Sequence, residues 1–282
     1  MVRSITFLEA GFTEQYEKIV NPVTGKWRKI RFPSTVALIE HPRHGYLLFD
    51  AGYSGRFKEV TRRFPEKLYA WVTPVTVSSE TSAVGRLRGL GLAETDISHV
   101  ILSHFHADHI GGASDFSRAR YVASRREYDH LVSLGTVSQV RHGFLKALLP
   151  DSFESRTLWS DDFPVELKSL GPGWTGNDLL GDGSVFLVPL PGHTLGQMGL
   201  YVPSVGGVDY LLVADAAWLT PSFREEIPPM RITDLIFHDP PAYRDTLARI
   251  HRLDCETRSS GRLRILTCHC DEAMERERTH VV

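Results

Sequence analysis

A histidine-rich run at residues 103–112, SHFHADHIGG, constrains this chain more than any other feature. It follows the mostly apolar stretch 99–102 and brings four potential ligands within six residues: His104, His106, Asp108 and His109. Imidazole and carboxylate groups suit zinc, manganese or iron at neutral pH. Short His-rich tracts also occur as solvated loops, but the two closing glycines allow a tight turn behind the ligands. The run therefore predicts a metal-binding loop at the end of a strand.

Three later segments also end an apolar strand pattern with a histidine or an aspartate. Residues 184–190 lead into His193, the expected hairpin 199–213 leads into Asp215, and the strand pattern 262–266 leads into His269. Functional residues of layered α/β proteins gather on loops at one set of strand ends. We therefore expect these residues to converge with the first run.

In this order, the residues resemble the metal-binding motif of the metallo-β-lactamase superfamily. The resemblance extends from the expected strand pair 34–50 to His269, and it includes the LFDAG sequence of residues 48–52, where the family has an apolar strand ending in Asp-x-Gly. It implies an α/β fold, a four-layer αββα sandwich, in a single domain over residues 1–282.

The resemblance also implies a ligand set for two metal ions. His104, His106 and His193 would hold one ion; Asp108, His109 and His269 would hold the other; Asp215 would bridge both. Asp50 would orient a ligand imidazole. A turn-forming aspartate before a glycine is an equally good interpretation of Asp50 from the sequence alone.

The implied activity is hydrolysis by a hydroxide that bridges two divalent metal ions, with zinc favoured and manganese or iron as alternatives. Asp108 would shuttle a proton, and Asp215 would take part as the bridging ligand. An aspartate at 215 differs from the true β-lactamase branches, and His106 stands where flavodiiron oxidoreductases carry a glutamate.

Within the superfamily, the chain is most similar to the N-acyl-homoserine lactonase group. Three local matches carry this likeness: RREY at 125–128, PGHT at 191–194 and DAA at 215–217. That group has a tyrosine three residues after the bridging aspartate, whereas this chain has Trp218. An indole donates one N–H but is no phenolic acid. We therefore expect cleavage of a lactone or an ester, with Trp218 either at the substrate carbonyl or packed as an aromatic core residue.

The aromatic, proline-punctuated segment 64–74 is poorly periodic. In this family such insertions cover the site, so we expect an apolar lid or wall and a small-molecule substrate with a hydrophobic part. A surface loop or a contact within a homodimer would have the same composition.

Other function classes stay open. Persulfide dioxygenases of this fold share the motif but use a single iron ion. A metal-holding binding protein with little turnover is a second alternative. A phosphodiesterase or arylsulfatase is a third, although the sequence has no basic cluster to clamp an anion.

Bulk properties narrow the partners and the location. The formal charge of −2 gives no electrostatic reason for binding nucleic acid or an anionic membrane. The N-terminus reads as a strand without the apolar core of a signal peptide, and no apolar run reaches membrane-spanning length. Three cysteines form no disulfide framework, which favours the cytoplasm. Cys268 and Cys270 flank His269; a thiolate there could bind metal, and packing is the favoured interpretation.

The remaining histidines have weaker claims. We expect His142 to be exposed and give no role to His130, His251 or His280. His238 follows a strand-like run at 234–237 and could line the pocket or replace His269. Periodicity and end signals predict helices over these ranges: 81–90, 126–134, 137–149, 241–257 and, as a charged tail, 272–278.

Overall fold

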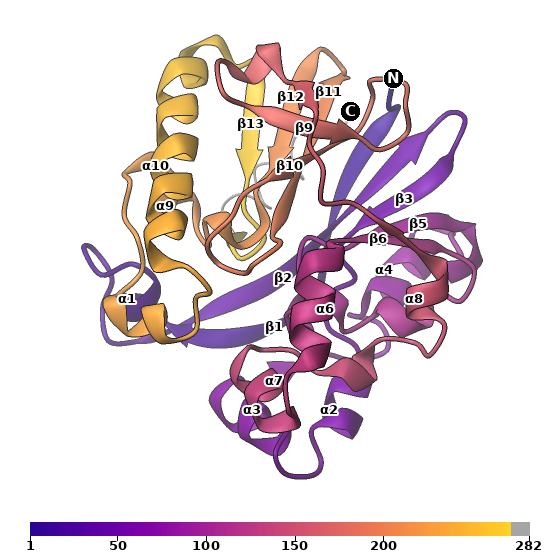
Figure 1. Ribbon diagram of the computed structural model, residues 1–282, viewed down its shortest axis with the longest axis vertical. Helices are drawn as coiled ribbons and strands as arrows, with labels where there is room; N and C mark the ends of the chain where they lie inside the picture. Colours follow the sequence, from indigo (N-terminus) through magenta and orange to yellow (C-terminus); the bar gives the residue numbers. More distant parts are fainter. Residues whose placement is uncertain (272–282) are drawn as a thin grey trace.

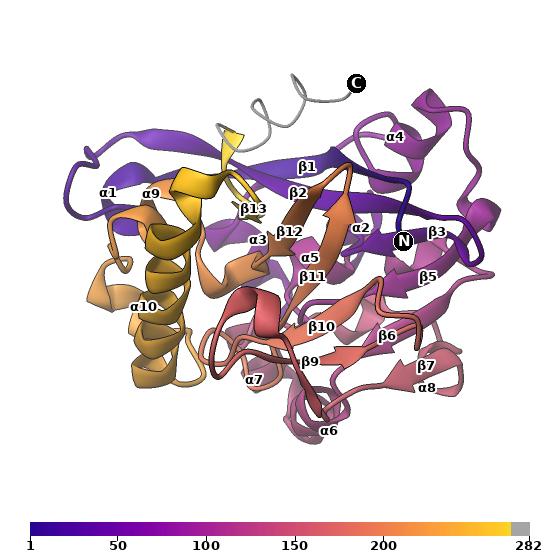
Figure 2. The same ribbon diagram turned by 90° about the horizontal axis from the view of Figure 1, so that it is seen from above.

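Two β-sheets lie face to face, with helices on their outer sides (Figures 1 and 2). The computed structural model of the protein describes residues 1–271. The first sheet consists, in spatial order, of β4 (Val75–Thr76), β1 (Ser4–Tyr16), β2 (Lys29–His41), β3 (Gly45–Phe49), β5 (Ile97–Ile101), β6 (Arg120–Ala123) and β7 (Thr157–Trp159). The second consists of β13 (Leu263–Leu266), β12 (Val208–Leu212), β11 (Met198–Val205), β10 (Phe186–Pro189), β9 (Thr175–Asp178) and β8 (Val165–Glu166).

The central strands are buried on both faces. Successive side chains of a strand point to opposite sides of the sheet, so β2 sends Val36 and Leu38 to one side and Ala37 and Ile39 to the other. The first pair packs in the cluster beneath the helices of the first sheet, and the second pair packs between the two sheets. This explains the near-continuous apolar runs in the sequence. The expected four-layer αββα sandwich is confirmed.

The helices are short except for one. They are α1 (Glu17–Val20), α2 (Arg56–Val60), α3 (Lys67–Val72), α4 (Ala83–Gly89), α5 (Ala107–Ile110), α6 (Arg125–Ser133), α7 (Thr136–Arg141), α8 (Phe153–Arg156), α9 (Thr220–Arg224) and α10 (Pro240–Thr257). The long helix α10 covers the outer face of the second sheet, where Leu247 and Ile250 pack in one cluster with Leu211 and Ile265 (Figure 1). The Asp239 side chain caps this helix by accepting from the Ala242 N–H at 3.0 Å.

Strand directions bring the expected ligands to one edge of the sandwich. In the first sheet, β3, β5 and β6 run parallel, so the segments after β3 and β5 leave the sheet at the same edge. In the second sheet, β13 runs parallel to β12, so Asp215 and His269 follow neighbouring strand ends. The ligand loops therefore meet because of topology, although they are far apart in the sequence.

Two expectations about local structure are wrong. The pattern at 137–149 forms no continuous helix: α7 ends at Arg141, Gly143 follows with a φ of +67°, and Lys146–Leu148 forms a short 3₁₀ turn. A left-handed residue interrupts helical hydrogen bonding, which the apolar spacing alone did not reveal. The strand-like run before His238 is instead a 3₁₀ helix, Arg231–Leu235.

The helices expected at 241–257 and 126–134 both form, and each of their bounds differs from the expected one by one residue at most. The helix expected at 272–278 lies outside the described residues. Among residues 1–271, no helix has both the length and the apolar character needed to cross a bilayer.

Candidate metal centre

The histidine-rich run leaves β5 and turns tightly against the loop after β3. Ser103 N donates to Asp50 Oδ1 at 2.7 Å, and His109 N closes the first turn of α5 by donating to His106 O at 3.0 Å. A Cβ atom at Gly112 would lie 2.5 Å from the carbonyl oxygen of Ala51. Glycine is required there because the two loops approach so closely.

A first group of ligand atoms gathers at the buried end of this turn. The group consists of His104, His106, His193 and Asp215, with one ligand atom of each within 4.8 Å of all the others. His193 Nε2 lies 2.9 Å from His106 Nδ1 and 3.1 Å from Asp215 Oδ2. Burial lowers the pKa of His106 to about 3, so this imidazole is neutral and offers a lone pair.

A second group shares Asp215 with the first. It consists of His109, Asp215, Cys268 and His269. His269 Nε2 lies 3.0 Å and His109 Nε2 lies 3.2 Å from Asp215 Oδ1. The two carboxylate oxygens of Asp215 therefore face different groups, Oδ2 the first and Oδ1 the second.

Asp108 lies beside the second group. Its Oδ2 atom is 3.5 Å from Nε2 of both His109 and His269. Burial alone would raise the pKa of Asp108, but these two imidazoles outweigh that effect and lower the pKa to about 2. Asp108 is therefore ionised at neutral pH.

Contacts behind the ligands set which ring nitrogen faces the centre. His269 Nδ1 donates to the carbonyl oxygen of Pro33 at 2.6 Å, and His109 Nδ1 lies 2.8 Å from Asp50 Oδ2. With a proton held on Nδ1, the Nε2 atom on the Asp215 side is the nitrogen that would bind a cation. Asp50 therefore lies where it can orient the His109 imidazole.

These donor sets fit two divalent cations. Imidazole nitrogens and carboxylate oxygens form the kind of site that borderline metals occupy. Within residues 1–271, the buried His104 Nε2 atom has no hydrogen-bond partner. An unpartnered buried acceptor is costly without a cation to bind it. Six of the seven proposed ligands lie in the two groups that share Asp215, and the seventh, Asp108, lies beside the second group.

Trp218 contacts the shared carboxylate. Its Nε1–H donates to Asp215 Oδ2 at 3.0 Å, and the side chain is 7% exposed. The indole also packs edge-on against Phe32 and Phe237. Because an indole has a single N–H, the structure assigns that donor to Asp215.

Glu127, on α6, lies at the candidate site, although the sequence alone predicted no role for it. Its carboxylate accepts from Phe105 N at 3.2 Å, from Thr194 Oγ1 at 2.7 Å and from Gly196 N at 2.8 Å. Burial raises its pKa to about 7 against the effect of these donors. The matching RREY sequence was the only available signal, because the contacts join segments far apart in the chain.

Three further histidines lie beside the first group. His130, His142 and His238 line a cavity of about 20 Å³ together with His106 and His193. The rings of His142 and His238 lie 6.0 Å and 5.8 Å from that of His130. His142 is half-buried rather than exposed, which corrects our expectation. His238 lines the cavity, and His269 lies in the second group beside Asp215.

The segment 64–74 contains α3 and has two different sides. Phe64 is 71% exposed and Trp71 is 67% exposed. Tyr69 is half-buried on the other side, where burial and the nearby charges of Asp108 and Asp215 raise the pKa of its hydroxyl well above the usual value. The segment thus has one side near the metal centre and an apolar outer side.

Comparisons with known proteins identify relatives of the whole architecture. Residues 30–262 match the family model described as Metallo-beta-lactamase superfamily. The N-acyl homoserine lactonase AttM of Azorhizobium caulinodans is 24% identical over 252 residues, which cover 88% of this chain and 86% of that protein.

Solved structures give the same result for the fold. A mutant of AiiA from B. thuringiensis, with N-decanoyl-L-homoserine bound at its active site, has a TM-score of 0.71 and 21% identity, covering 100% of this chain and 98% of that one. AidC, a dizinc quorum-quenching lactonase, has a TM-score of 0.65 and 16% identity, covering 95% and 87%.

Proposed function

Because the chain belongs to the metallo-β-lactamase superfamily, we propose that it is a dinuclear metal-dependent hydrolase that cleaves a lactone or an ester with an apolar part. Relatives are named N-acyl homoserine lactonases, which confirms the expected class, a lactonase-like metallo-hydrolase. The observation that carries the dinuclear reaction is the position of Asp215, whose two oxygens face two separate groups of ligands.

The chain's own residues supply distinct parts of this reaction. When bound, a pair of divalent cations supplies a hydroxide near neutral pH and polarises the substrate carbonyl. Asp108 is ionised beside the second group, so its carboxylate can accept the proton of the attacking water and deliver it to the leaving alkoxide. Asp215 would serve as the bridging ligand, and the Trp218 N–H would hold its Oδ2 atom in place.

The substrate class follows from the wall beside the centre. The segment 64–74 brings Tyr69 toward Asp108 and exposes Phe64 and Trp71 at its outer side. An apolar wall stabilises an acyl chain or ring by removing it from water. We propose that this segment binds the hydrophobic part of the substrate.

Zinc is the proposed ion, and the cytoplasm is the proposed location. Imidazole ligands suit zinc, and a dizinc lactonase is among the structural neighbours. Cys255, Cys268 and Cys270 are free thiols, which fits a reducing compartment.

The test combines elemental analysis with an activity screen on one preparation. We expect about two metal ions per chain and acid release from a lactone series, with kcat/KM rising as the acyl chain lengthens. His106→Ala and Asp215→Ala should lose both metal and activity, whereas retained activity in either variant would overturn the dinuclear assignment. A single iron ion with oxygen consumption would favour the dioxygenase alternative. Acid release from phosphodiesters or aryl sulfates, without acid release from lactones, would identify a phosphodiesterase or an arylsulfatase instead.

Trp71→Ala separates the two interpretations of the outer wall. If the segment binds substrate, KM for long-chain lactones should rise while KM for short-chain lactones stays the same. A change in oligomeric state with KM unaltered would instead identify a contact between two copies of the chain.

A further inference from the structure

Cys268 lies in the metal centre itself. Its Sγ atom is 2.9 Å from Asp215 Oδ1, and the residue is buried. Sγ, Asp215 Oδ1 and the facing nitrogens of His109 and His269 all lie within 4.8 Å of one another. The sulfur thus belongs to a compact set of four potential ligand atoms.

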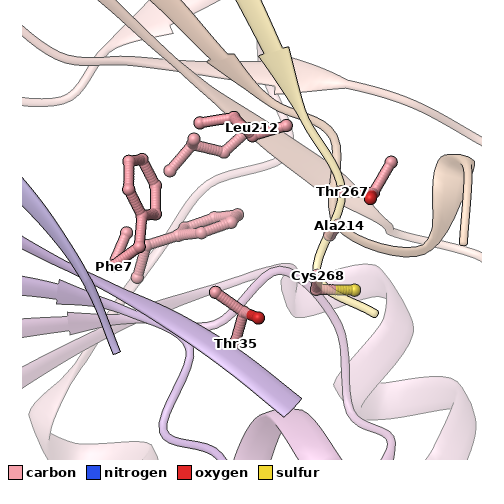
Figure 3. A pocket seen from close by; sticks show the side chains of 9 residues that line it. Phe7, Thr35, Leu212, Ala214, Thr267 and Cys268 are labelled. Atoms are coloured by element: carbon pink, nitrogen blue, oxygen red, sulfur yellow. The ribbon is translucent and has the colours of Figure 1, made fainter. Parts of the chain in front are cut away.

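The direction of the side chain explains this position. Cys268 follows β13 and borders a small cavity between the two sheets, and Figure 3 shows its sulfur turned away from Phe7. Its carbonyl oxygen accepts from Thr35 N at 3.1 Å, which ties the residue to β2. Cys270 differs, because its sulfur accepts from Thr220 Oγ1 at 3.2 Å and joins neither group of ligand atoms.

We propose that Cys268 is a ligand of the second metal ion, which makes that site a mixed thiolate, imidazole and carboxylate site. The inference rests on the dinuclear centre proposed above. On binding, the thiol proton passes to solvent, and a lone pair of the thiolate forms the bond to the cation. The first site, with imidazole and carboxylate donors only, has no such sulfur.

A thiolate ligand changes which metals the second site prefers. Soft sulfur donors favour zinc and cobalt over manganese and magnesium, whereas imidazole and carboxylate donors discriminate less. The second site should therefore bind zinc selectively.

Cobalt substitution tests the proposal directly. A thiolate bound to Co²⁺ gives a sulfur-to-metal charge-transfer band in the near ultraviolet, which imidazole and carboxylate ligands do not give. In the full chain loaded with two equivalents of Co²⁺, this band should be present. The Cys268→Ser variant should lose the band and bind the ion of the second site at least about tenfold more weakly. Removing a residue that only contacts a ligand already lowers metal affinity by about that factor. The Cys270→Ser and Cys255→Ser variants should keep the band.

X-ray absorption of the dizinc protein supplies a measurement that needs no variant, and a zinc–sulfur distance of about 2.3 Å is expected. Two bound ions and lactone hydrolysis without the charge-transfer band would overturn the thiolate ligand and leave the proposed function standing. Fewer than two bound ions would overturn both. A band that persists in Cys268→Ser would assign the sulfur to another cysteine and overturn the proposal.

Discussion

Glu127 joins two loops that carry proposed metal ligands, because its carboxylate accepts a hydrogen bond of 2.7 Å from the Thr194 hydroxyl. Thr194 directly follows His193, and the same carboxylate accepts from Phe105 N, between His104 and His106. Three of the first-group imidazoles are thus anchored to one buried acceptor. Such outer contacts fix the orientation of ligand side chains.

Replacing this acceptor should weaken both the fold and the metal centre. Glu127→Gln keeps the shape, but its amide group cannot accept from every donor that the carboxylate satisfies. A buried donor left without a partner costs about 1–3 kcal/mol, so urea unfolding should show a loss of that size. Zinc affinity of the first site should fall as well. Glu154→Gln, which removes a carboxylate that accepts from the Tyr128 hydroxyl away from the centre, is the control and should leave zinc affinity unchanged.

The same variant should change the pH dependence of stability in the metal-free protein. Burial raises the pKa of Glu127 to about 7 from an ordinary value of 4.5. Between these values the folded state binds more protons than the unfolded state, so this group lowers stability as pH rises through the window. The original protein should therefore lose unfolding free energy between about pH 5 and about pH 8, whereas Glu127→Gln should not lose this part. The difference in unfolding free energy between the two proteins should change in favour of the variant at the higher pH. A pH-independent difference between the two proteins would contradict the assignment.

Trp218→Phe should loosen the bridging carboxylate. The change keeps an aromatic ring but removes the N–H that donates to Asp215 Oδ2. Loss of such a contact lowers metal affinity by about 10–100-fold, which competition with a chelator can measure. Trp174→Phe, at a buried tryptophan that belongs to neither ligand group, should have no such effect. Trp218→Tyr should raise lactone hydrolysis if this position reaches the substrate carbonyl; unchanged rates across a lactone series would mean that it does not.

Gly143→Ala should displace a ligand. A Cβ atom there would lie 2.5 Å from His106 Cδ2, and the backbone has a φ of +67°. We expect reduced metal content together with a loss of stability of about 1–2 kcal/mol from the left-handed conformation. Gly91→Ala is matched in conformation, with a φ of +78° and nothing within 4 Å of the new Cβ atom. It should lose stability alone, and equal metal loss in both variants would contradict the steric explanation.

Asp50→Asn should affect the two sites unequally. Asp50 accepts from Ser103 N at 2.7 Å and lies 2.8 Å from His109 Nδ1. An asparagine can no longer accept from both, so the His109 ring loses its fixed orientation. A two-step metal titration should show about 10–100-fold weaker binding of the second ion. Equal weakening of both steps would indicate general destabilisation instead.

The sequence alone identified the proposed ligands, because their chemistry and order are local properties of the chain. His104 to His109 lie within one turn after a strand, and His193, Asp215 and His269 each follow an apolar run. Apolar runs also predicted individual strands, since a strand buried on both faces needs continuous apolar residues. A proline at the start predicted the long helix α10, whereas the two-sheet sandwich was implied by the family resemblance.

Only the tertiary structure decided what surrounds those ligands. Glu127 finds its partners 22, 67 and 69 residues away, so no local pattern marks it. From the sequence, the indole N–H of Trp218 could point toward the substrate, the core or a carboxylate. In the fold it donates to Asp215, because the Asp215 side chain lies beside it. Cys268 reads as a small packed residue until the parallel pairing of β12 with β13 places its sulfur beside Asp215. Hydrogen bonds and ligand contacts act over about 3 Å, so such roles depend on which distant segments the fold brings together.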